Sequence, residues 1–552
     1  MSRIARNLLT GTLLAFGLGS ALAGAQDRTR LPDIGSSAGA LLGPAQQREY
    51  GQMLLAQLRH YDYVLDDPLL GNWLTGVGNR LAVSSDRPQQ PFTFFWLKDR
   101  QINAFATLGG YVGMNAGLVL AAEDEGEMAS VLSHEIAHVT QAHVLRSVER
   151  AQKDSIPILL AMLGAIAIAQ SSGGHSSDDA AMAALASAQG LMAQRQIDYT
   201  RSNESEADRI GILTLDRAGY DPGAAAAMFQ RMQAAFRSNR GGARERTPDY
   251  LQTHPVTTTR IAEAKQRAEE LGKGTMLATS STPEGAVSER VPRPGSAVAI
   301  ANAAGGSGNP LLPGGLRIEA LASRGDSGQF PMAKERLRVL SANTPDAAIR
   351  EYEKMRRSGE LSRAQRYGLA LARLRDGQGA AAMAELEPLL QSEPGDLWLN
   401  LAMAQAEARA GRDKAADTRL DSLAARMPRN RAVALTYAGI LAERNTLEAG
   451  SRAQAILRPL QNGSADDPVF QTTFARANEI AGDPIRAGEA WAEAAYLRGR
   501  PEQALVQLNT LKKRPDLDYY ARARIDARIA AITPTVLELR RQGVRDEDLE
   551  HD

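Results

Sequence analysis

The spacing of apolar positions divides the chain into a mixed N-terminal part and an almost wholly helical C-terminal part. Residues 45–58 and 68–81 repeat apolar side chains with helical periodicity. The patterns of residues 92–97 and 102–114 instead predict strands, with Gly109-Gly110 as a turn between two of them. Helical periodicity then resumes and continues to the end of the chain. The pattern therefore predicts a mainly α fold whose N-terminal α+β part contains one small sheet.

Residues 330–552 are rich in Ala and Leu, and they repeat. Gly377 and Gly411 lie 34 residues apart, and Pro394 and Pro428 are separated by the same interval. This period resembles the tetratricopeptide repeat (TPR), a helix–turn–helix unit. Helical hairpins with coincidental spacing are the alternative. Stacked repeats form a solenoid whose concave face binds extended or helical peptides, so we expect a binding module here.

Two stretches differ in composition from both parts. Residues 272–329 contain runs of Gly, Pro and Ser, which predict a flexible linker between a domain at 26–271 and the helical repeats. At the N-terminus, Arg3 and Arg6 precede a short apolar run that ends in small residues. This layout predicts a cleaved secretory signal peptide at residues 1–25, with a membrane anchor as the alternative.

Length, charge and cysteine content narrow the classes of function. A chain of 552 residues is too long for one hydrophobic core. Lys+Arg and Asp+Glu both number 64, and this balance argues against nucleic acid as the main partner. The absence of cysteine excludes a thiol nucleophile, an iron–sulfur cluster, a disulfide framework and a cysteine-ligated zinc. A secreted chain without cysteine fits a bacterial periplasm, and any metal must be held by His, Asp or Glu.

The strongest chemical signal is the sequence HEIAH at residues 134–138. Residues 127–144 contain no Gly or Pro and predict a helix, with an acidic run at its N-terminal end. His134 and His138 then share one helix face and can bind the same metal ion. Glu135 is placed to reach the attacking water as a general base. Two solvated histidines on a helix are the alternative.

A catalytic zinc ion also needs a third protein ligand and a position open to water. The acidic sequence at residues 203–208 offers Glu204 and Asp208, four apart on a predicted helix. One carboxylate can bind the metal while the other accepts the remaining N–H of a ligand histidine. Glu206 lies on a different face and is the weaker candidate. Taken alone, this run would be a solvated helix start, but beside HEIAH it predicts metal ligation.

HEIAH followed by ESEAD resembles the gluzincin peptidases, the family that includes HtpX and the CAAX prenyl protease. The resemblance covers nearly the whole chain and implies a metallopeptidase domain at residues 26–271 with one zinc ion per subunit. It assigns the zinc ligands to His134, His138 and Glu204. It also assigns the general base to Glu135 and gives Asp208 a catalytic role, whereas reasoning from the residues favours an orienting role for Asp208.

Two further stretches are similar to parts of that family. Asn103, Ala104 and Phe105 resemble an edge strand along which a peptide substrate lies, with an ordinary buried strand as the alternative. His254, followed by Pro255, resembles a loop near the metal, where His254 either ligates zinc in a resting state or donates to the developing oxyanion. The other histidines match nothing in the family, and we expect them to lie outside the site: His60, His143, His175 and His551.

The resemblance implies a periplasmic zinc endopeptidase that acts in quality control and assembly of outer-membrane proteins. Its repeats would recruit misassembled outer-membrane β-barrel proteins or their assembly machinery. The alternative is a TPR chaperone or scaffold with latent or vestigial proteolysis, which the intact motif residues disfavour. The apolar segment at residues 156–169 is too short to span a membrane; it predicts a buried or lid helix, with a loop in peripheral contact with a membrane as the alternative.

Overall fold

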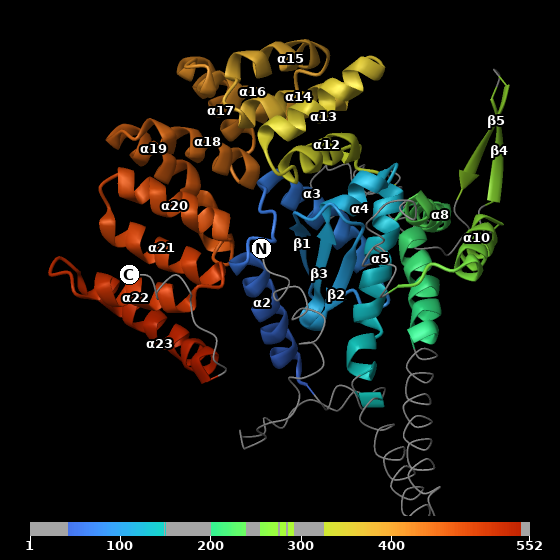
Figure 1. Ribbon diagram of the computed structural model, residues 1–552, viewed down its shortest axis with the longest axis horizontal. Helices are drawn as coiled ribbons and strands as arrows, with labels where there is room; N and C mark the ends of the chain where they lie inside the picture. Colours follow the sequence, from blue (N-terminus) through green and yellow to red (C-terminus); the bar gives the residue numbers. More distant parts are fainter. Residues whose placement is uncertain are drawn as a thin grey trace, which may run out of the picture.

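The structure is a computed structural model that describes residues 42–147, 149–150, 200–238, 254–273, 276–282, 285–291 and 325–541. Helices dominate these residues, and a small three-stranded sheet lies in the N-terminal part (Figure 1). The predicted mainly α fold is confirmed. Among the described helices, none is long and apolar enough to cross a membrane. The predicted signal peptide and the apolar segment at 156–169 lie outside the described residues.

The N-terminal sheet is preceded by two helices, α2 (Pro44–His60) and α3 (Pro68–Val83). Its strands are β1 (Thr93–Leu97), β2 (Ala104–Thr107) and β3 (Tyr111–Asn115). The central strand β3 pairs in parallel with β1 and antiparallel with β2, so β2 lies at an edge. Between β2 and β3, the short 3-10 helix η2 (Leu108–Gly110) contains two glycines with positive φ. The predicted strands and the glycine turn are therefore confirmed.

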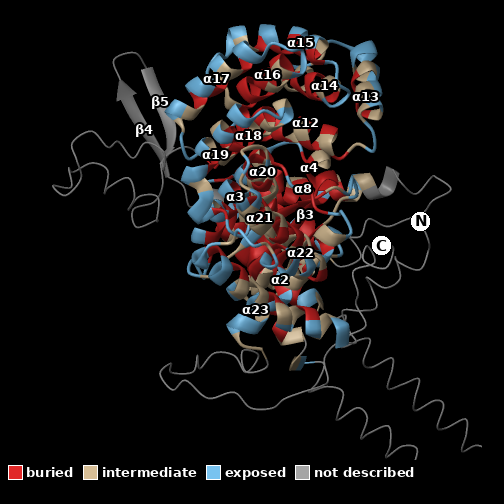
Figure 2. Ribbon diagram, turned by 90° about the vertical axis from the view of Figure 1, so that its left-hand side faces the viewer, coloured by how far each residue is buried: buried red, intermediate tan, exposed pale blue. Residues whose placement is uncertain are grey.

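The central helix of this part is α5 (Glu125–Thr140), which follows the short helix α4 (Ala116–Ala121). Asp124 caps α5, because its Oδ1 accepts a hydrogen bond from the backbone N–H of Glu127 at 2.9 Å. Most residues of α5 are buried, since the helix packs against β2, α3 and α8. Figure 2 shows the buried residues, in red, gathered around α4, α8 and β3. The prediction that the helix continues to residue 144 is wrong. Ala142 adopts a left-handed conformation with a φ of 54°, which separates α5 from a new helical turn at 143–147.

The remaining described elements of this part are helical, apart from one hairpin. Residues 200–217 form a helix, followed by α8 (Gly223–Ser238) and α10 (Thr258–Lys273). Strands β4 (Met276–Thr282) and β5 (Gly285–Val291) pair antiparallel within the stretch predicted as a linker. The proposed division into domains stays a prediction.

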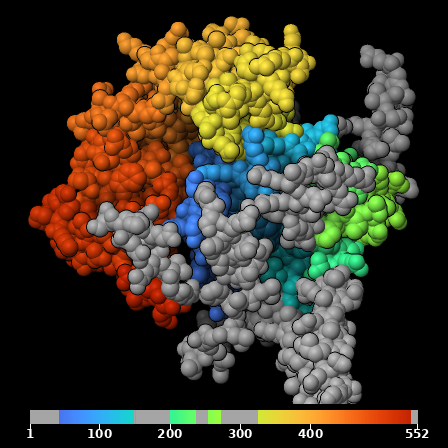
Figure 3. All heavy atoms as spheres, in the orientation of Figure 1, coloured from blue at the N-terminus to red at the C-terminus, as the bar shows by residue number. Residues whose placement is uncertain are grey.

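The C-terminal part consists of helices that pack against their neighbours along the chain. They are α12 (Phe330–Leu340), α13 (Pro345–Ser358), α14 (Arg363–Arg375), α15 (Gly379–Ser392), α16 (Leu397–Arg409), α17 (Asp413–Arg426), α18 (Arg431–Arg444), α19 (Leu447–Leu457), the 3-10 helix η5 (Arg458–Gly463), α20 (Pro468–Ile480), α21 (Pro484–Leu497), α22 (Pro501–Lys512) and α23 (Tyr519–Arg541). From yellow α12 to red α23, they curve around α2 and α3 (Figures 1 and 3). Gly377 and Gly411, the predicted repeat glycines, both end a helix with positive φ. Their assignment to TPR units stays a prediction.

A buried ion pair joins α12 to the start of α3. Arg336 contacts Asp67 with two nitrogens, Nε at 2.8 Å and Nη2 at 2.6 Å. Asp67 is also the N-cap of α3 and accepts from the backbone N–H of Leu70 at 3.0 Å. Burial opposes the charge of Arg336, but Asp67 and Tyr367 outweigh it and hold the pKa of Arg336 above its usual range. The pair therefore connects the two parts of the chain at a point where solvent screens little.

We expect Asp67→Ala to lower the free energy of unfolding by about 3–5 kcal/mol, because it leaves a buried guanidinium unpaired and α3 uncapped. The matched control is Asp86→Ala, which removes an exposed carboxylate 2.8 Å from Arg217 and should cost under about 1 kcal/mol. Denaturant unfolding of both variants measures the difference. Equal losses would contradict the assignment.

Candidate metal centre

Helix 200–217 crosses α5 at the HEIAH sequence. At the crossing, Gly211 faces His134, and a Cβ on Gly211 would lie only 3.1 Å from the backbone N and Cα of His134. Ala137 and Ala207 pack together near this point and are buried. Because these residues are small, the two helices approach closely. The carboxylates one and two turns before Gly211 thereby reach the imidazoles of α5.

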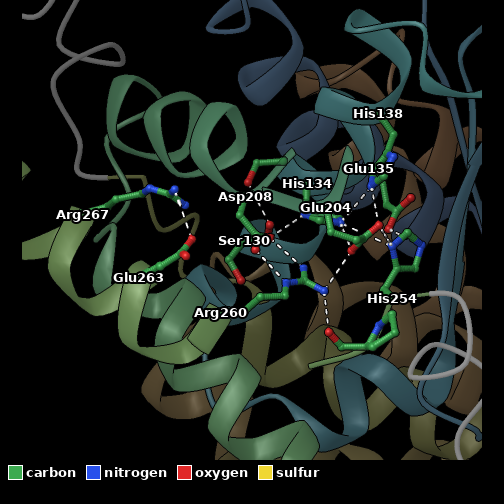
Figure 4. A network of polar contacts seen from close by, with 12 residues as sticks. Ser130, His134, Glu135, His138, Glu204, Asp208, His254, Arg260, Glu263 and Arg267 are labelled. Carbon is green, nitrogen blue, oxygen red and sulfur yellow. Dashed lines mark hydrogen bonds and ion pairs between the residues drawn. The ribbon is translucent and has the colours of Figure 1, made fainter. Parts of the chain in front are cut away.

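Four side chains converge beside this crossing, and Figure 4 shows them pointing toward one another. His134, His138, Glu204 and His254 offer ligand atoms that all lie within 4.8 Å of one another, and no other such group occurs among the described residues. The Nε2 atoms of His134 and His138 are 3.0 Å apart. Glu204 Oε2 lies 3.4 Å from His134 Nε2. The structure thus brings together the three predicted ligands and adds His254.

Glu135 lies next to this cluster. Its Oε1 is 3.8 Å from His254 Nε2, and the side chain is almost fully buried. Among the residues that the structure describes, none forms a hydrogen bond with Glu135 Oε1. A buried carboxylate oxygen is costly to leave unpaired, so this one is available to a water molecule or a ligand. The arrangement fits the predicted general base.

Asp208 contacts the ring nitrogen of His134 that points away from the cluster. Its Oδ1 is 3.0 Å from His134 Nδ1, the nitrogen that points away from the cluster. Arg260, from α10, binds both oxygens of Asp208 at 2.7 Å and also lies 2.8 Å from Glu204 Oε2. Figure 4 shows the guanidinium between the two carboxylates. Asp208 is therefore placed to orient His134, the role that reasoning from the residues favoured.

Charges within the cluster place a proton on one histidine in the absence of metal. Burial opposes the charged form of His134, but Asp208 and Glu204 outweigh it and raise the pKa of His134 to about 10. For His138, burial and the neighbouring positive charges outweigh Glu204 and lower its pKa to about 3. Despite burial, the pKa values of Glu204 and Asp208 are held below their usual range by their histidine and arginine partners. Of the two histidines, His134 is therefore the one whose protonated form the neighbouring carboxylates stabilise.

The expectation that His143 lies outside the site is wrong. Its Nδ1 is 2.9 Å from His138 Nδ1, and its Nε2 is 3.1 Å from Glu206 Oε2. The helix break at Ala142 turns His143 back toward α5, whereas an unbroken helix would have placed it off the ligand face. No Gly or Pro marks this break in the sequence. His60 lies on α2 against Tyr61, while His175 and His551 lie outside the described residues.

The predicted substrate strand is at the edge of the sheet. Among the described residues, β2 pairs only with β3, so its other side has no strand partner. Ala104 is fully buried, and the ring of Phe105 packs against Phe95 at a centroid distance of 5.9 Å. Asn103 accepts a hydrogen bond from the backbone N–H of Asn115, which extends the pairing with β3. β2 is thus an edge strand of the described sheet, and its substrate role stays a prediction, with an ordinary buried strand as the alternative.

Comparison with known sequences bears on this geometry. The model of peptidase family M48 matches residues 68–268, from α3 to α10. The chain is also 30% identical over 535 residues to the beta-barrel assembly-enhancing protease of Escherichia coli strain K12, with 96% of each chain covered. The chain belongs to peptidase family M48. The matched M48 segment contains both HEIAH and ESEAD, so the protein is a metalloprotease, and the predicted gluzincin resemblance is confirmed.

Two further relatives match shorter stretches of the chain. A putative beta-barrel assembly-enhancing protease of Vibrio cholerae is 41% identical over 244 residues, which cover 44% of this chain and 48% of the relative. The mitochondrial metalloendopeptidase OMA1 of Saccharomyces cerevisiae is 30% identical over 199 residues, which cover 35% of this chain and 49% of that protein.

We expect metal binding at this M48 site to release about one proton at neutral pH, because a metal ion and a proton compete for His134. The folded-state pKa of about 10 is above the ordinary value, so the proton is held below pH 10. The apparent affinity should therefore rise about tenfold per pH unit up to that value. Calorimetric titration of zinc in buffers with different ionisation enthalpies measures the proton count. No proton release, or an affinity independent of pH, would contradict the assignment.

Proposed function

We propose that the protein is a zinc endopeptidase whose metal is held by His134, His138 and Glu204. The observation that carries this proposal is the convergence of their ligand atoms within a buried cluster of the M48 segment. Two imidazoles and one carboxylate suit zinc and leave a position for substrate or water. When bound, a zinc ion would polarise the scissile carbonyl and make the attacking water more acidic.

The chain's own residues would carry out the remaining steps of peptide-bond hydrolysis. Glu135 takes a proton from the attacking water and delivers it to the leaving amine nitrogen. Asp208, whose Oδ1 lies 3.0 Å from His134 Nδ1, would accept the Nδ1–H of His134 and leave the other ring nitrogen free to bind metal. Arg260 holds Asp208 in place with two hydrogen bonds. The substrate backbone pairs with the outer side of β2, and this binding is independent of substrate sequence.

We also propose that the helices α12–α23 form TPR units, which recruit misassembled outer-membrane β-barrel proteins in the periplasm or the machinery that assembles these proteins. Support comes from the Escherichia coli relative, which is named for beta-barrel assembly and aligns over 96% of both chains. A cavity of about 330 Å³ among the C-terminal helices offers a place for a peptide segment. It is lined by Gln461, Gln471, Phe474, Arg486, Glu489, Ala490, Glu493, Leu508, Arg524, Ile525 and Arg528.

We expect Glu135→Gln to keep zinc and to lower casein cleavage by at least about 10²-fold, because it removes only the general base. Glu204→Gln should lose both zinc affinity and cleavage, because it removes a ligand. Metal analysis of the purified proteins, together with a cleavage assay, separates the two outcomes. Equal zinc retention in both variants would show that Glu204 is not a ligand. Wild-type zinc binding without cleavage of any client would favour the chaperone or scaffold alternative.

The position of His254 favours the resting-state ligand role over the oxyanion role. Its Nδ1 is 2.8 Å from Glu204 Oε1 and 3.4 Å from His134 Nε2, so this nitrogen lies within the ligand cluster. A fourth protein ligand would occupy the position that the attacking water requires. We therefore propose that His254 restrains the enzyme until a client displaces the loop that carries it.

We expect His254→Ala to increase cleavage of a client or of the enzyme itself several-fold, with zinc retained through the other three ligands. His60→Ala, on α2, is the control and should leave cleavage unchanged. Cleavage rates and zinc content are measured on the same preparations. A fall of about 10²–10³-fold with zinc retained would instead assign His254 to the oxyanion.

A further inference from the structure

The two ring nitrogens of His138 face different partners. Nε2 points into the cluster, 3.0 Å from His134 Nε2 and 3.4 Å from Glu204 Oε1. Nδ1 points away from it, toward His143 Nδ1 at 2.9 Å. The outer contact of His138 thus corresponds to the contact that Asp208 makes with the outer nitrogen of His134.

The contact between His143 and Glu206 decides which histidine donates in the His138–His143 hydrogen bond. Glu206 Oε2 lies 3.1 Å from His143 Nε2 and 3.0 Å from Arg146 Nη1. A carboxylate can only accept, so His143 Nε2 is the donor in that contact. A neutral imidazole with its proton on Nε2 has a lone pair on Nδ1. His143 therefore accepts from His138 Nδ1–H, and this leaves the lone pair of His138 Nε2 directed at the metal position.

The local backbone is arranged to make this contact. Ala142 has a φ of 54°, a left-handed conformation that is energetically costly for a non-glycine residue. The cost is incurred directly before His143, which begins the helical turn at 143–147 and is 3% exposed. Ser147 donates to the backbone oxygen of His143 at 2.8 Å and ties that turn together. A strained residue next to a buried polar contact is a common feature of functional sites.

We propose that His143 and Glu206 are positioning residues that fix the ring orientation and the tautomer of His138. Glu206 selects the proton position on His143, and His143 then selects the proton position on His138. Such outer partners of a metal ligand typically contribute 10- to 100-fold in metal affinity. The inference rests on the proposed role of His138 as a metal ligand.

The test measures zinc affinity of the full chain by competition with a chromophoric chelator. We expect His143→Leu to weaken zinc binding about 10- to 100-fold, because leucine fills the space but cannot accept a hydrogen bond. His143→Asn should recover most of the affinity, because its amide oxygen takes the place of Nδ1. Glu206→Ala, at a partly exposed position, should weaken binding about three- to tenfold. Asp86→Ala, the exposed control, should stay within about twofold of wild type.

A second readout concerns the geometry around the metal. With cobalt in place of zinc, the visible absorption of His143→Leu should shift or lose intensity relative to wild type, whereas His143→Asn should resemble wild type. Thermal melting of the metal-free proteins checks that each variant folds. If His143→Leu does not fold, Glu206→Ala and His143→Asn decide the test.

Two results would overturn the proposal. If a folded His143→Leu variant binds zinc within about twofold of the wild-type affinity, His143 does not support metal binding by His138. Equal weakening in His143→Asn and His143→Leu would show that the imidazole acts by packing alone. His138→Ala distinguishes this failure from failure of the proposed function. If wild type binds no zinc, or if His138→Ala binds as tightly as wild type, the metal-ligand assignment itself is wrong.

Discussion

The balance of buried charge around Arg260 is the constraint on which the site depends. Glu204 and Asp208 bring two negative charges into a region where an unpaired charge is costly. Arg260 contacts both carboxylates, and without metal the proton on His134 supplies a second positive charge. A divalent ion would replace that proton, and Glu135 would offset the added charge. Arg260 thus gives both buried carboxylates a positive partner that does not depend on the metal.

The scaffold that holds these charges is shared with the C-terminal helices. At the start of α5, the carboxylate of Glu125 accepts from Trp73 Nε1 at 3.0 Å, Tyr220 OH at 2.8 Å and the backbone N–H of Ser327 at 3.0 Å. Ser327 lies three residues before the start of α12, whose Arg336 makes the ion pair with Asp67 at the start of α3. The first turn of α5, the helix that carries HEIAH, is thus bonded to the segment that leads into α12. Displacement of that segment would break a hydrogen bond to Glu125 and so disturb the first turn of α5, because the closely packed interior cannot absorb the movement.

Sequence reasoning succeeded where chemistry depends on local spacing and failed where it depends on backbone breaks. The i, i+4 spacing of HEIAH, the acidic cap of α5 and the glycine turn before β3 are local patterns, and the structure contains all three. By contrast, alanine favours helices, so the residue type at position 142 does not predict a left-handed conformation. Because the helix break at Ala142 was not predicted, His143 was expected outside the site. The pairing of Arg260 with Asp208 spans 52 residues, and neither helix alone predicts it.

The two proposed ligand histidines contact outer partners of different kinds, and this makes the cluster asymmetric. His134 contacts a carboxylate directly, and Arg260 holds that carboxylate inside the core. His138 contacts an imidazole, whose carboxylate partner Glu206 is 29% exposed and paired with Arg146 at the surface. Solvent therefore screens the charge of Glu206, whereas it screens the buried pair of Asp208 and Arg260 much less. The outer contacts of His134 therefore lie within the core, whereas those of His138 lead through His143 to a partly exposed ion pair.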